Sequence, residues 1–280
     1  MGSALAYHFS QFDVSIPSIV EKNATRCLAL SKTFPNIGIS SSLSAKSISH
    51  SNIIFICVPD DQLVEVVSTV NSLNVDLSEK IFVHSSGAYS SEILMGLKES
   101  NGRIASAHPI YSFGNNEPGS ISLEGAYFDL EGDDVAVDRL KNLFQRARIK
   151  CIEITSNQKI AVHLASVFYS NYFVGLAQIA QEVLRASDFH EENFWEPFVP
   201  LIESTLKNLS ANSLAQALTG PIKRGDILTV EKHLAYLKSH NSDAVPAYVQ
   251  MARAILPLAS LPPKSIHRVE EILRAYDTKN

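Results

Sequence analysis

Two apolar, strand-like segments of the chain end in side chains that could transfer protons. One segment ends at His84 and is followed by Ser85 and Ser86, and a later one ends at His108. Parallel strands bring their carboxyl ends to one edge of a sheet, where ligands bind. An imidazole can exchange a proton with a hydroxyl or carbonyl group, and the serines could bond a carboxylate or an amide. Each histidine could instead be a hydrogen-bonded structural residue.

A second candidate site is a loop in which glycine and charge are concentrated between helical segments. It contains Thr219, Gly220, Lys223, Arg224 and Asp226. A planar guanidinium pairs well with a carboxylate, so we expect Arg224, with Lys223, to bind an acidic substrate group. The alternative is a plain helix connection, with Gly220 as a C-cap and Asp226 as the N-cap of the next helix.

A polar pair lies within the long apolar helix predicted after the first half of the chain. His163 and Asn171 are eight positions apart, which separates them by roughly 80° around a helix. Both could border one cleft and orient a substrate there. They could equally satisfy their neighbours in a helix interface.

The start of the chain matches only the last part of a dinucleotide-binding fingerprint, G-x-G-x-x-G. Gly2 and Ser3 fit the end of that fingerprint, while the expected strand and first two glycines are missing from the sequence. Further along, Val58, Pro59 and Asp60 end an apolar strand-like run, where we also expect contact with a cofactor.

Charged residues after the first predicted strand bear on which dinucleotide would bind. Lys22, Asn23 and Arg26 stand where an acidic residue would hold the ribose of NAD. Cations at this place favour the 2′-phosphate of NADP, although Glu21 adjoins them. The sequence therefore predicts NADP as the cofactor.

Strand-like and helical segments alternate through the first half of the chain. The predicted strands are 16–20, 37–39, 52–58, 80–84, 103–108, 126–131 and 151–154. The predicted helices are 3–12, 24–34, 63–73, 91–99 and 135–148. This alternation predicts an α/β fold with right-handed crossovers and a mainly parallel sheet.

After residue 155 the pattern becomes helical throughout. We expect helices at 156–187, 191–209, 229–240, 244–259 and 265–276. The change divides the chain into a nucleotide-binding domain, 1–155, and a helical substrate and dimerisation domain, 156–280. The segment 161–180 is apolar and long enough to span a bilayer. Because it contains histidine and asparagine, we expect it instead in a soluble core or a dimer interface.

The composition excludes several classes of protein. A net charge of −5 with both signs interspersed lacks the basic footprint of a nucleic-acid binder. The three cysteines, Cys27, Cys57 and Cys151, are far apart and lack metal-ligand spacing, so we expect neither disulfides nor a metal. Reduced cysteines and no recognisable signal peptide predict a cytoplasmic protein.

These motifs together resemble a family of predicted Rossmann-like oxidoreductases with a helical C-terminal domain of unknown function. The family is related to pyrroline-5-carboxylate reductase and prephenate dehydrogenase. The resemblance covers most of the chain and rests on the segments 58–61, 84–88, 108–113, 131–133, 163–171, 200–202, 217–226 and 233–234. The blocks 163–171 and 217–226 are the specific ones. His108-Pro109 is similar to the His-Pro motif of prephenate dehydrogenases, whose histidine assists hydride transfer. His84-Ser85 is similar to the loop that carries their active-site serine.

The resemblance implies a Rossmann-like doubly wound sheet followed by an all-α domain that dimerises. It implies an NADP-dependent oxidoreductase acting on a small carbonyl, imine or hydroxy-acid compound between the domains. The expected catalytic residues are His108, His163, Asn171 and Arg224. The expected cofactor-binding residues are Gly2, Ser3, Lys22, Asn23, Val58, Pro59, Asp60, His84 and Ser85. The expected substrate-binding residues are Ser86, Thr219, Lys223 and Asp226. The alternative is a non-catalytic dimer that binds a nucleotide or metabolite through a degenerate cofactor site.

Overall fold

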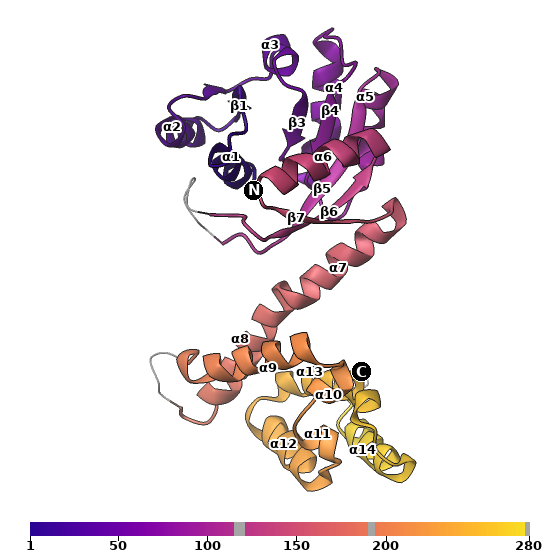
Figure 1. Ribbon diagram of the computed structural model, residues 1–280. Coiled ribbons are helices and arrows are strands. Elements are labelled where there is room, and N and C mark those ends of the chain that lie inside the picture. The colour runs from indigo at the N-terminus through magenta and orange to yellow at the C-terminus, as the bar shows by residue number, and fades with distance from the viewer. Residues whose placement is uncertain (115–120, 190–193, 278–280) are drawn as a thin grey trace. The chain divides into compact units, whose positions relative to one another are not determined.

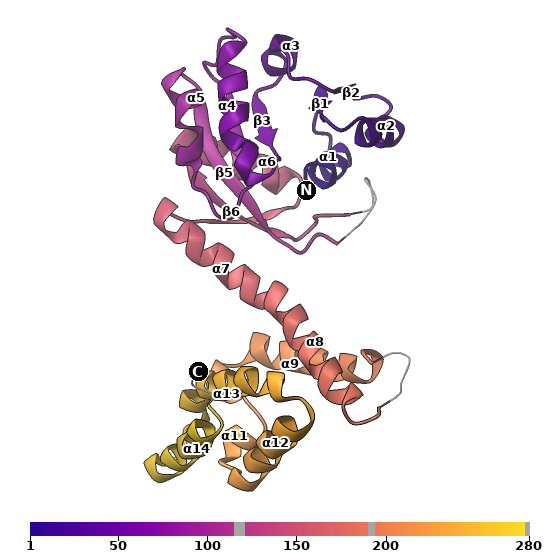
Figure 2. The same cartoon turned by 180° about the vertical axis from the view of Figure 1, so that it is seen from behind.

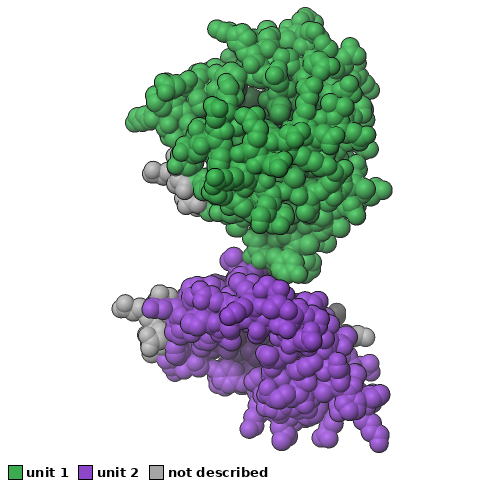
Figure 3. Space-filling view, viewed as in Figure 1, with its two compact units in different colours: residues 1–171 green, residues 172–280 purple. Residues whose placement is uncertain are grey.

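The computed structural model describes residues 1–114, 121–189 and 194–277. The chain forms two compact units, Met1–Asn171 and Tyr172–Asn280, which are coloured separately in Figure 3. The first unit extends beyond residue 155, where we expected the helical half to begin. Lys159 and His163, which follow that point, contact Asp129 and His108 of the sheet. The start of the helix expected at 191–209 lies outside the described residues.

A five-stranded sheet forms the centre of the first unit (Figure 1). Its order is β3 (Ile53–Ile56), β4 (Ile81–His84), β5 (Arg103–Ile110), β6 (Tyr127–Gly132) and β7 (Lys150–Glu153). All neighbouring strands are parallel except β5 and β6, which are antiparallel. The predicted α/β class with a mainly parallel sheet is therefore confirmed, with the last two strands, β6 and β7, running opposite to the first three.

Strand β4 shows why this sheet is covered on both faces. Ile81 and Val83 enter one apolar cluster and Phe82 enters another, and all three side chains are fully buried. Successive side chains of a strand point to opposite faces, so an unbroken apolar run needs two packed faces. Figures 1 and 2 show the sheet from its two sides.

Helices from different parts of the chain supply those two faces. The first cluster includes residues of α1 (Gly2–Ser10) and α6 (Asp134–Arg146). The second includes residues of α4 (Leu63–Ser72), α5 (Met95–Glu99) and the 3-10 helix η2 (Ser91–Leu94). A further 3-10 helix, η1 (Asp60–Gln62), precedes α4. The crossovers of the parallel strands thus place helices on both sides of the sheet.

A separate two-stranded parallel sheet precedes the main one. It pairs β1 (Ser18–Val20) with β2 (Gly38–Ser40). The helices α2 (Ala24–Thr33) and α3 (Ala45–Ser49) follow these two strands. Ala6, Leu30 and Phe34 form the small buried cluster beneath them.

The second unit consists of helices, as expected. They are α8 (Asn171–Arg185), η4 (Glu196–Phe198), α9 (Val199–Ala211), α10 (Leu214–Ala217), α11 (Pro221–Arg224), α12 (Ile227–His240), η5 (Ser242–Ala244), α13 (Val245–Ile255), η6 (Leu256–Ala259) and α14 (Pro263–Ala275). Val230, Leu234, Val249, Val269 and Leu273 are fully buried in its core, which α12, α13 and α14 build together.

The long apolar helix of the sequence differs from the prediction in two ways. It begins with η3 (Ser156–Gln158) and α7 (Lys159–Tyr169), and it is interrupted at Ser170, where φ is −118° and ψ is −74°. The segment 156–185 is long and apolar enough to cross a membrane by length and composition, and its most apolar window is not buried within the chain.

Gly132 ends β6 at a point where no side chain fits. Its φ is +139°, and a Cβ there would lie 2.5 Å from the Ile104 carbonyl oxygen and 2.6 Å from Ala105 Cα. We expect Gly132→Ala to lower the free energy of unfolding by about 3 kcal/mol, because backbone strain and overlap add. Gly125 has a φ of +76° and no atom within 4 Å of its Cβ position, so Gly125→Ala should cost about 1 kcal/mol. Urea unfolding of both variants checks this, and equal losses would contradict it.

Candidate functional site

The reversed strand β6 places a carboxylate beside the histidine that the sequence singled out. In the antiparallel register of β5 and β6, Asp129 lies directly opposite His108. The two side chains meet, with His108 Nδ1 3.0 Å from Asp129 Oδ2. Because an ionised carboxylate only accepts hydrogen bonds, this contact puts a proton on Nδ1 of the ring.

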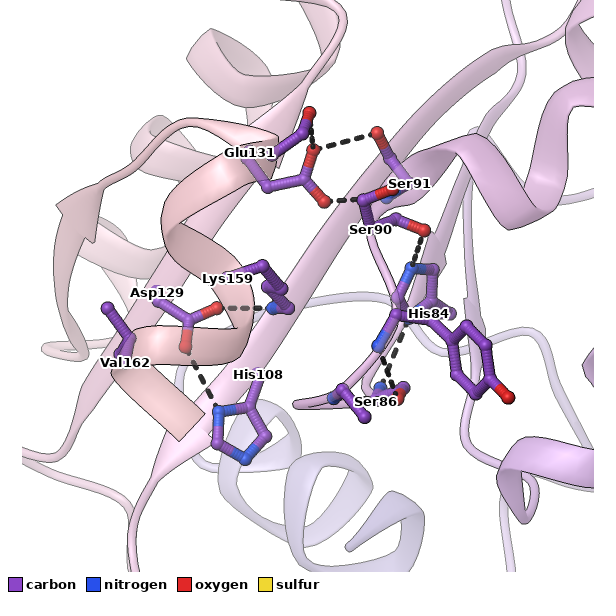
Figure 4. A network of polar contacts seen from close by, with 12 residues as sticks. His84, Ser86, Ser90, Ser91, His108, Asp129, Glu131, Lys159 and Val162 are labelled. Carbon is purple, nitrogen blue, oxygen red and sulfur yellow. Dashed lines mark hydrogen bonds and ion pairs between the residues drawn. The ribbon is translucent and has the colours of Figure 1, made fainter. Parts of the chain in front are cut away.

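Lys159 completes a buried group of three charged or titratable side chains (Figure 4). Its Nζ lies 2.5 Å from Asp129 Oδ1, and the Lys159 and Asp129 side chains are 2% and 0% exposed. Burial alone would raise the pKa of Asp129, but the hydrogen bond from His108 and the Lys159 ammonium group lower it below its usual value. The carboxylate is thus held ionised between two donors.

The other ring nitrogen of His108 lies close to Gly87, and the His108 side chain is 14% exposed. A Cβ on Gly87 would lie 2.8 Å from His108 Nε2 and would overlap His163 Nδ1. The two imidazole rings stand edge to face, with centroids 5.2 Å apart. His163 Nδ1 is buried without a hydrogen-bond partner, and burial, followed by nearby His108, lowers the pKa of its ring. Two imidazole nitrogens therefore converge where the chain has no side chain.

Both ring nitrogens of His84 contact backbone groups of the loop that follows it. The side chain is fully buried; its Nε2 lies 3.1 Å from the Ser90 carbonyl oxygen and its Nδ1 accepts from the Ser86 amide at 3.1 Å. Burial lowers the pKa of His84 to about 4. Ser86 Oγ in turn accepts from the amides of Ala88 and Tyr89. His84 and Ser86 thus shape the loop that carries Gly87.

Glu131 is a buried carboxylate that the sequence analysis included in a matching segment but not among the expected site residues. It accepts from the amide of Ser91 at 2.6 Å, from Ser91 Oγ at 2.9 Å and from Ser156 Oγ at 3.3 Å (Figure 4). These bonds attach η2 and the start of η3 to β6. Their effect is to fix the segment that leads into Lys159.

Several residues expected to bind a cofactor lie at the carboxyl end of the sheet. Gly2 packs against Cys57, with 3.1 Å from its Cβ position to Cys57 Cβ, and Ser85 bonds the Cys57 thiol. Burial raises the pKa of that thiol to about 11. Ser3 lies in the first turn of α1, whose N-terminus has no side-chain cap.

The other expected cofactor residues are exposed except Val58, which is half-buried. Val58 and Pro59 follow β3, and the exposed Asp60 acts electrostatically on both His84 and His163. Asn23 caps α2 by accepting from the Arg26 amide. Lys22 pairs with Glu65 at 2.8 Å and Arg26 with Glu21 at 3.4 Å, both cations being exposed.

Two charged side chains of the loop in the second unit hydrogen-bond nearby backbone groups. Lys223 Nζ donates to the Ala215 carbonyl at 2.9 Å, and Asp226 caps α12 by accepting from the Thr229 amide and hydroxyl. Gly220, with φ +90°, precedes α11 rather than ending a helix, and Gly225, with φ +64°, is its C-cap. Arg224 is exposed, and its expected carboxylate contact stays a prediction, as does a role for Thr219.

Asn171 and His163 do not share one uninterrupted helix. The break at Ser170 separates α7, which carries His163, from α8, which Asn171 begins as an exposed residue. The expected 80° relation between them does not apply. Within residues 1–114, 121–189 and 194–277, no three or more His, Cys, Asp or Glu side chains are grouped to hold a metal.

The buried, neutral His84 predicts a specific pH dependence of stability. Its pKa is about 4 in the folded state, whereas an unfolded histidine titrates near 6.5, so below pH 6.5 the unfolded state binds more protons. Stability should therefore fall as the pH decreases from about 6.5 to about 4. Between pH 7 and pH 5, urea unfolding should show a loss about 2 kcal/mol larger in the wild type than in His84→Gln. Equal losses in the two proteins would exclude His84 as the cause.

Comparisons with known proteins agree with this architecture. Residues 1–109 match the family profile of a Rossmann-like domain, and residues 126–255 match that of a domain of unknown function, DUF2520. A search of curated proteins found no matching sequence.

Solved structures share the fold over nearly the whole chain. A protein from Thermotoga maritima is 26% identical, with 91% of this chain and 95% of that chain covered and a TM-score of 0.70. A predicted NADP oxidoreductase from Bacteroides fragilis is 17% identical, with 91% and 93% covered and a TM-score of 0.72. An imine reductase from Myxococcus stipitatus, solved with NADP+, is 16% identical, with 99% and 96% covered and a TM-score of 0.63. The chain is therefore similar to a Rossmann-like domain over residues 1–109 and to the DUF2520 domain over residues 126–255.

Proposed function

We propose that the protein is an NADP-dependent oxidoreductase of a small carbonyl, imine or hydroxy-acid substrate, with His108 as its proton-exchanging residue. The observation that carries the proposal is the orientation of His108. Its Nδ1 is fixed on Asp129, and its Nε2 lies close to Gly87, as does His163 Nδ1. A buried nitrogen without a partner beside a second free nitrogen fits a bound polar group.

The residues at the carboxyl end of the sheet have the chemistry that a dinucleotide requires. The uncapped N-terminus of α1 offers backbone amides to a pyrophosphate. Lys22 and Arg26 offer exposed cations to a 2′-phosphate, with Asn23 between them. Gly2, Ser3, Val58, Pro59, Asp60, His84 and Ser85 are the further residues that we assign to this end of the site. The structural neighbours named for NADP support the choice of cofactor.

His108 supplies the proton that such a reaction needs. NADPH, when bound, supplies a hydride to the carbon of a carbonyl or imine group. A protonated His108 can give its Nε2 proton to the oxygen or nitrogen, while Nδ1 keeps its hydrogen bond to Asp129. In the opposite direction, neutral Nε2 takes the proton of the hydroxyl or amine. The His163 ring lies beside His108 and can orient the reacting group.

We also propose that the protein is a homodimer, covered along its apolar helix by a second copy. Large apolar side chains are exposed on α7, α8 and α9: Ile160 56%, Leu164 50%, Val174 68%, Leu201 62% and Leu206 61%. Within each unit taken by itself, large apolar side chains exposed to water mark an interaction site. A bilayer is a poorer partner for this helix because its start is held by Lys159 and His163 in the polar site. The three free cysteines suit a reducing compartment, and we place the protein in the cytoplasm.

The proposed role of His108 predicts a loss of turnover without a loss of folding. Small keto, imino and hydroxy acids can be screened by the absorbance change of NADPH or NADP+. With any substrate so found, His108→Ala should lower kcat at least about 100-fold, because the proton-transfer group is gone. NADPH affinity, measured by fluorescence titration, should stay within about twofold.

The control is His267→Ala, which removes an exposed histidine of α14 and should change neither value. A His108→Ala variant that keeps the wild-type rate would refute the assignment of His108.

The dimer is tested by placing charge on the exposed apolar helices. We expect a dimer at micromolar concentration by light scattering, and a monomer for Val174→Glu/Leu201→Glu, because two buried carboxylates cannot be solvated in an apolar interface. Leu228→Glu is the matched control, since Leu228 is 69% exposed on α12. A monomeric wild type, or a double variant that remains dimeric, would be inconsistent with the proposal.

A further inference from the structure

We propose that Lys159 is a positioning residue that acts through Asp129 to keep His108 uncharged, with its proton on Nδ1 and its Nε2 bare. The inference rests on the proposed function for the use made of His108. The effect on the ring itself is a property of the free protein. Neither Lys159 nor Asp129 belongs to the residues that the sequence motifs singled out.

Asp129 is fully buried, and its two oxygens are divided between two partners, Oδ2 facing His108 and Oδ1 facing Lys159. A carboxylate out of water needs a compensating positive charge. If His108 were its only partner, that charge would have to come from an imidazolium ring.

Lys159 removes this requirement. Its ammonium group lies 2.5 Å from Asp129, and its side chain is almost as buried as the carboxylate. The lysine and aspartate together are neutral, so a neutral His108 ring leaves the group balanced. A protonated ring would add a second positive charge near Lys159. The structure therefore favours the neutral ring, while the hydrogen bond to Asp129 selects Nδ1 as its protonated nitrogen.

The other titratable groups near the His108 ring are His163, His84 and Asp60. None of these three places a second negative charge in contact with the ring. His163 of α7 faces the ring, and burial is the main reason why the pKa of its imidazole is lowered. His84 of β4 is buried with a pKa lowered to about 4. Asp60 of η1 is exposed and acts on these two histidines. Asp129 is the carboxylate that contacts His108, and Lys159 has already balanced it.

The consequence is a site prepared to take up a proton. A bare Nε2 accepts a hydrogen bond from a substrate hydroxyl or amine that reaches the ring. When the O–H or N–H bond breaks, its proton forms the Nε2–H bond and the electron pair stays on the substrate oxygen or nitrogen. Lys159 then limits how strongly the resulting imidazolium holds that proton, so that it can be released to solvent.

The test is nitrogen NMR of the full chain, labelled with ¹⁵N-histidine, at pH 7 and without cofactor. The side-chain nitrogen shifts of His108, assigned with His108→Gln, distinguish a bare from a protonated nitrogen. In the wild type we expect a protonated Nδ1 and a bare Nε2. A wild-type ring that is imidazolium at pH 7, or that carries its proton on Nε2, would overturn the proposal without any further variant.

Variants of Lys159 then separate a charge effect from a packing effect. Lys159→Met should raise the ratio of charged to neutral His108 about tenfold, as expected for the loss of one nearby positive charge. Lys159→Gln should do the same while keeping a hydrogen-bond donor, and it is the variant to use if the methionine protein does not fold. Lys159→Arg should keep the ratio within about twofold. Asp129→Asn should lower it.

A folded Lys159→Gln or Lys159→Met protein with the wild-type ratio would contradict the proposal, because a merely structural lysine would change the melting temperature and leave the proton unmoved. Failure to find NADPH binding or turnover would count against the proposed function alone. An unchanged His108 ratio would count against the role of Lys159 alone.

Discussion

A fully buried carboxylate has to be neutralised, and the way in which Asp129 is neutralised organises the candidate site. One oxygen holds His108 from the neighbouring strand, and the other holds Lys159 from the start of α7. The same contacts therefore orient the ring that faces Gly87 and attach the apolar helix to the sheet. Glu131, two residues along the same strand, fixes the segment just before that helix through Ser91 and Ser156. Strand β6 thus carries both carboxylates that hold the residues of the candidate site in position.

The sequence predicted the parts of the fold that depend on regular patterns. The apolar run at Ile81–Val83 is buried on both faces, as an inner parallel strand requires. The ends of β4 and β5 come together at one region, so the loop after His84 and the His108 ring lie near each other, joined by His163. Asp129 and Lys159 could not be identified in the same way. The reversal of β6 is a tertiary feature, and only its antiparallel register brings Asp129 opposite His108.

A charged, glycine-rich loop is weaker evidence for a ligand site than its composition indicates. Lys223 hydrogen-bonds carbonyl groups of the adjoining loops, and Asp226 caps the following helix. Both side chains thus satisfy backbone groups that the turns leave open. His84 is similar, because both of its ring nitrogens contact backbone groups of the loop that follows it. By contrast, an isolated carboxylate in the apolar strand 127–130 and a lysine beginning an apolar helix were signals that could have been read as a buried ion pair.

The most direct measurement is a nuclear Overhauser experiment on the full chain with bound NADP+. If the redox chemistry takes place beside Gly87 and His108, the nicotinamide C4 proton should show cross-peaks to the Gly87 Hα and His108 Hε1 protons. Saturable binding of NADP+ with cross-peaks to neither residue would show that the His108–Asp129–Lys159 group serves another purpose.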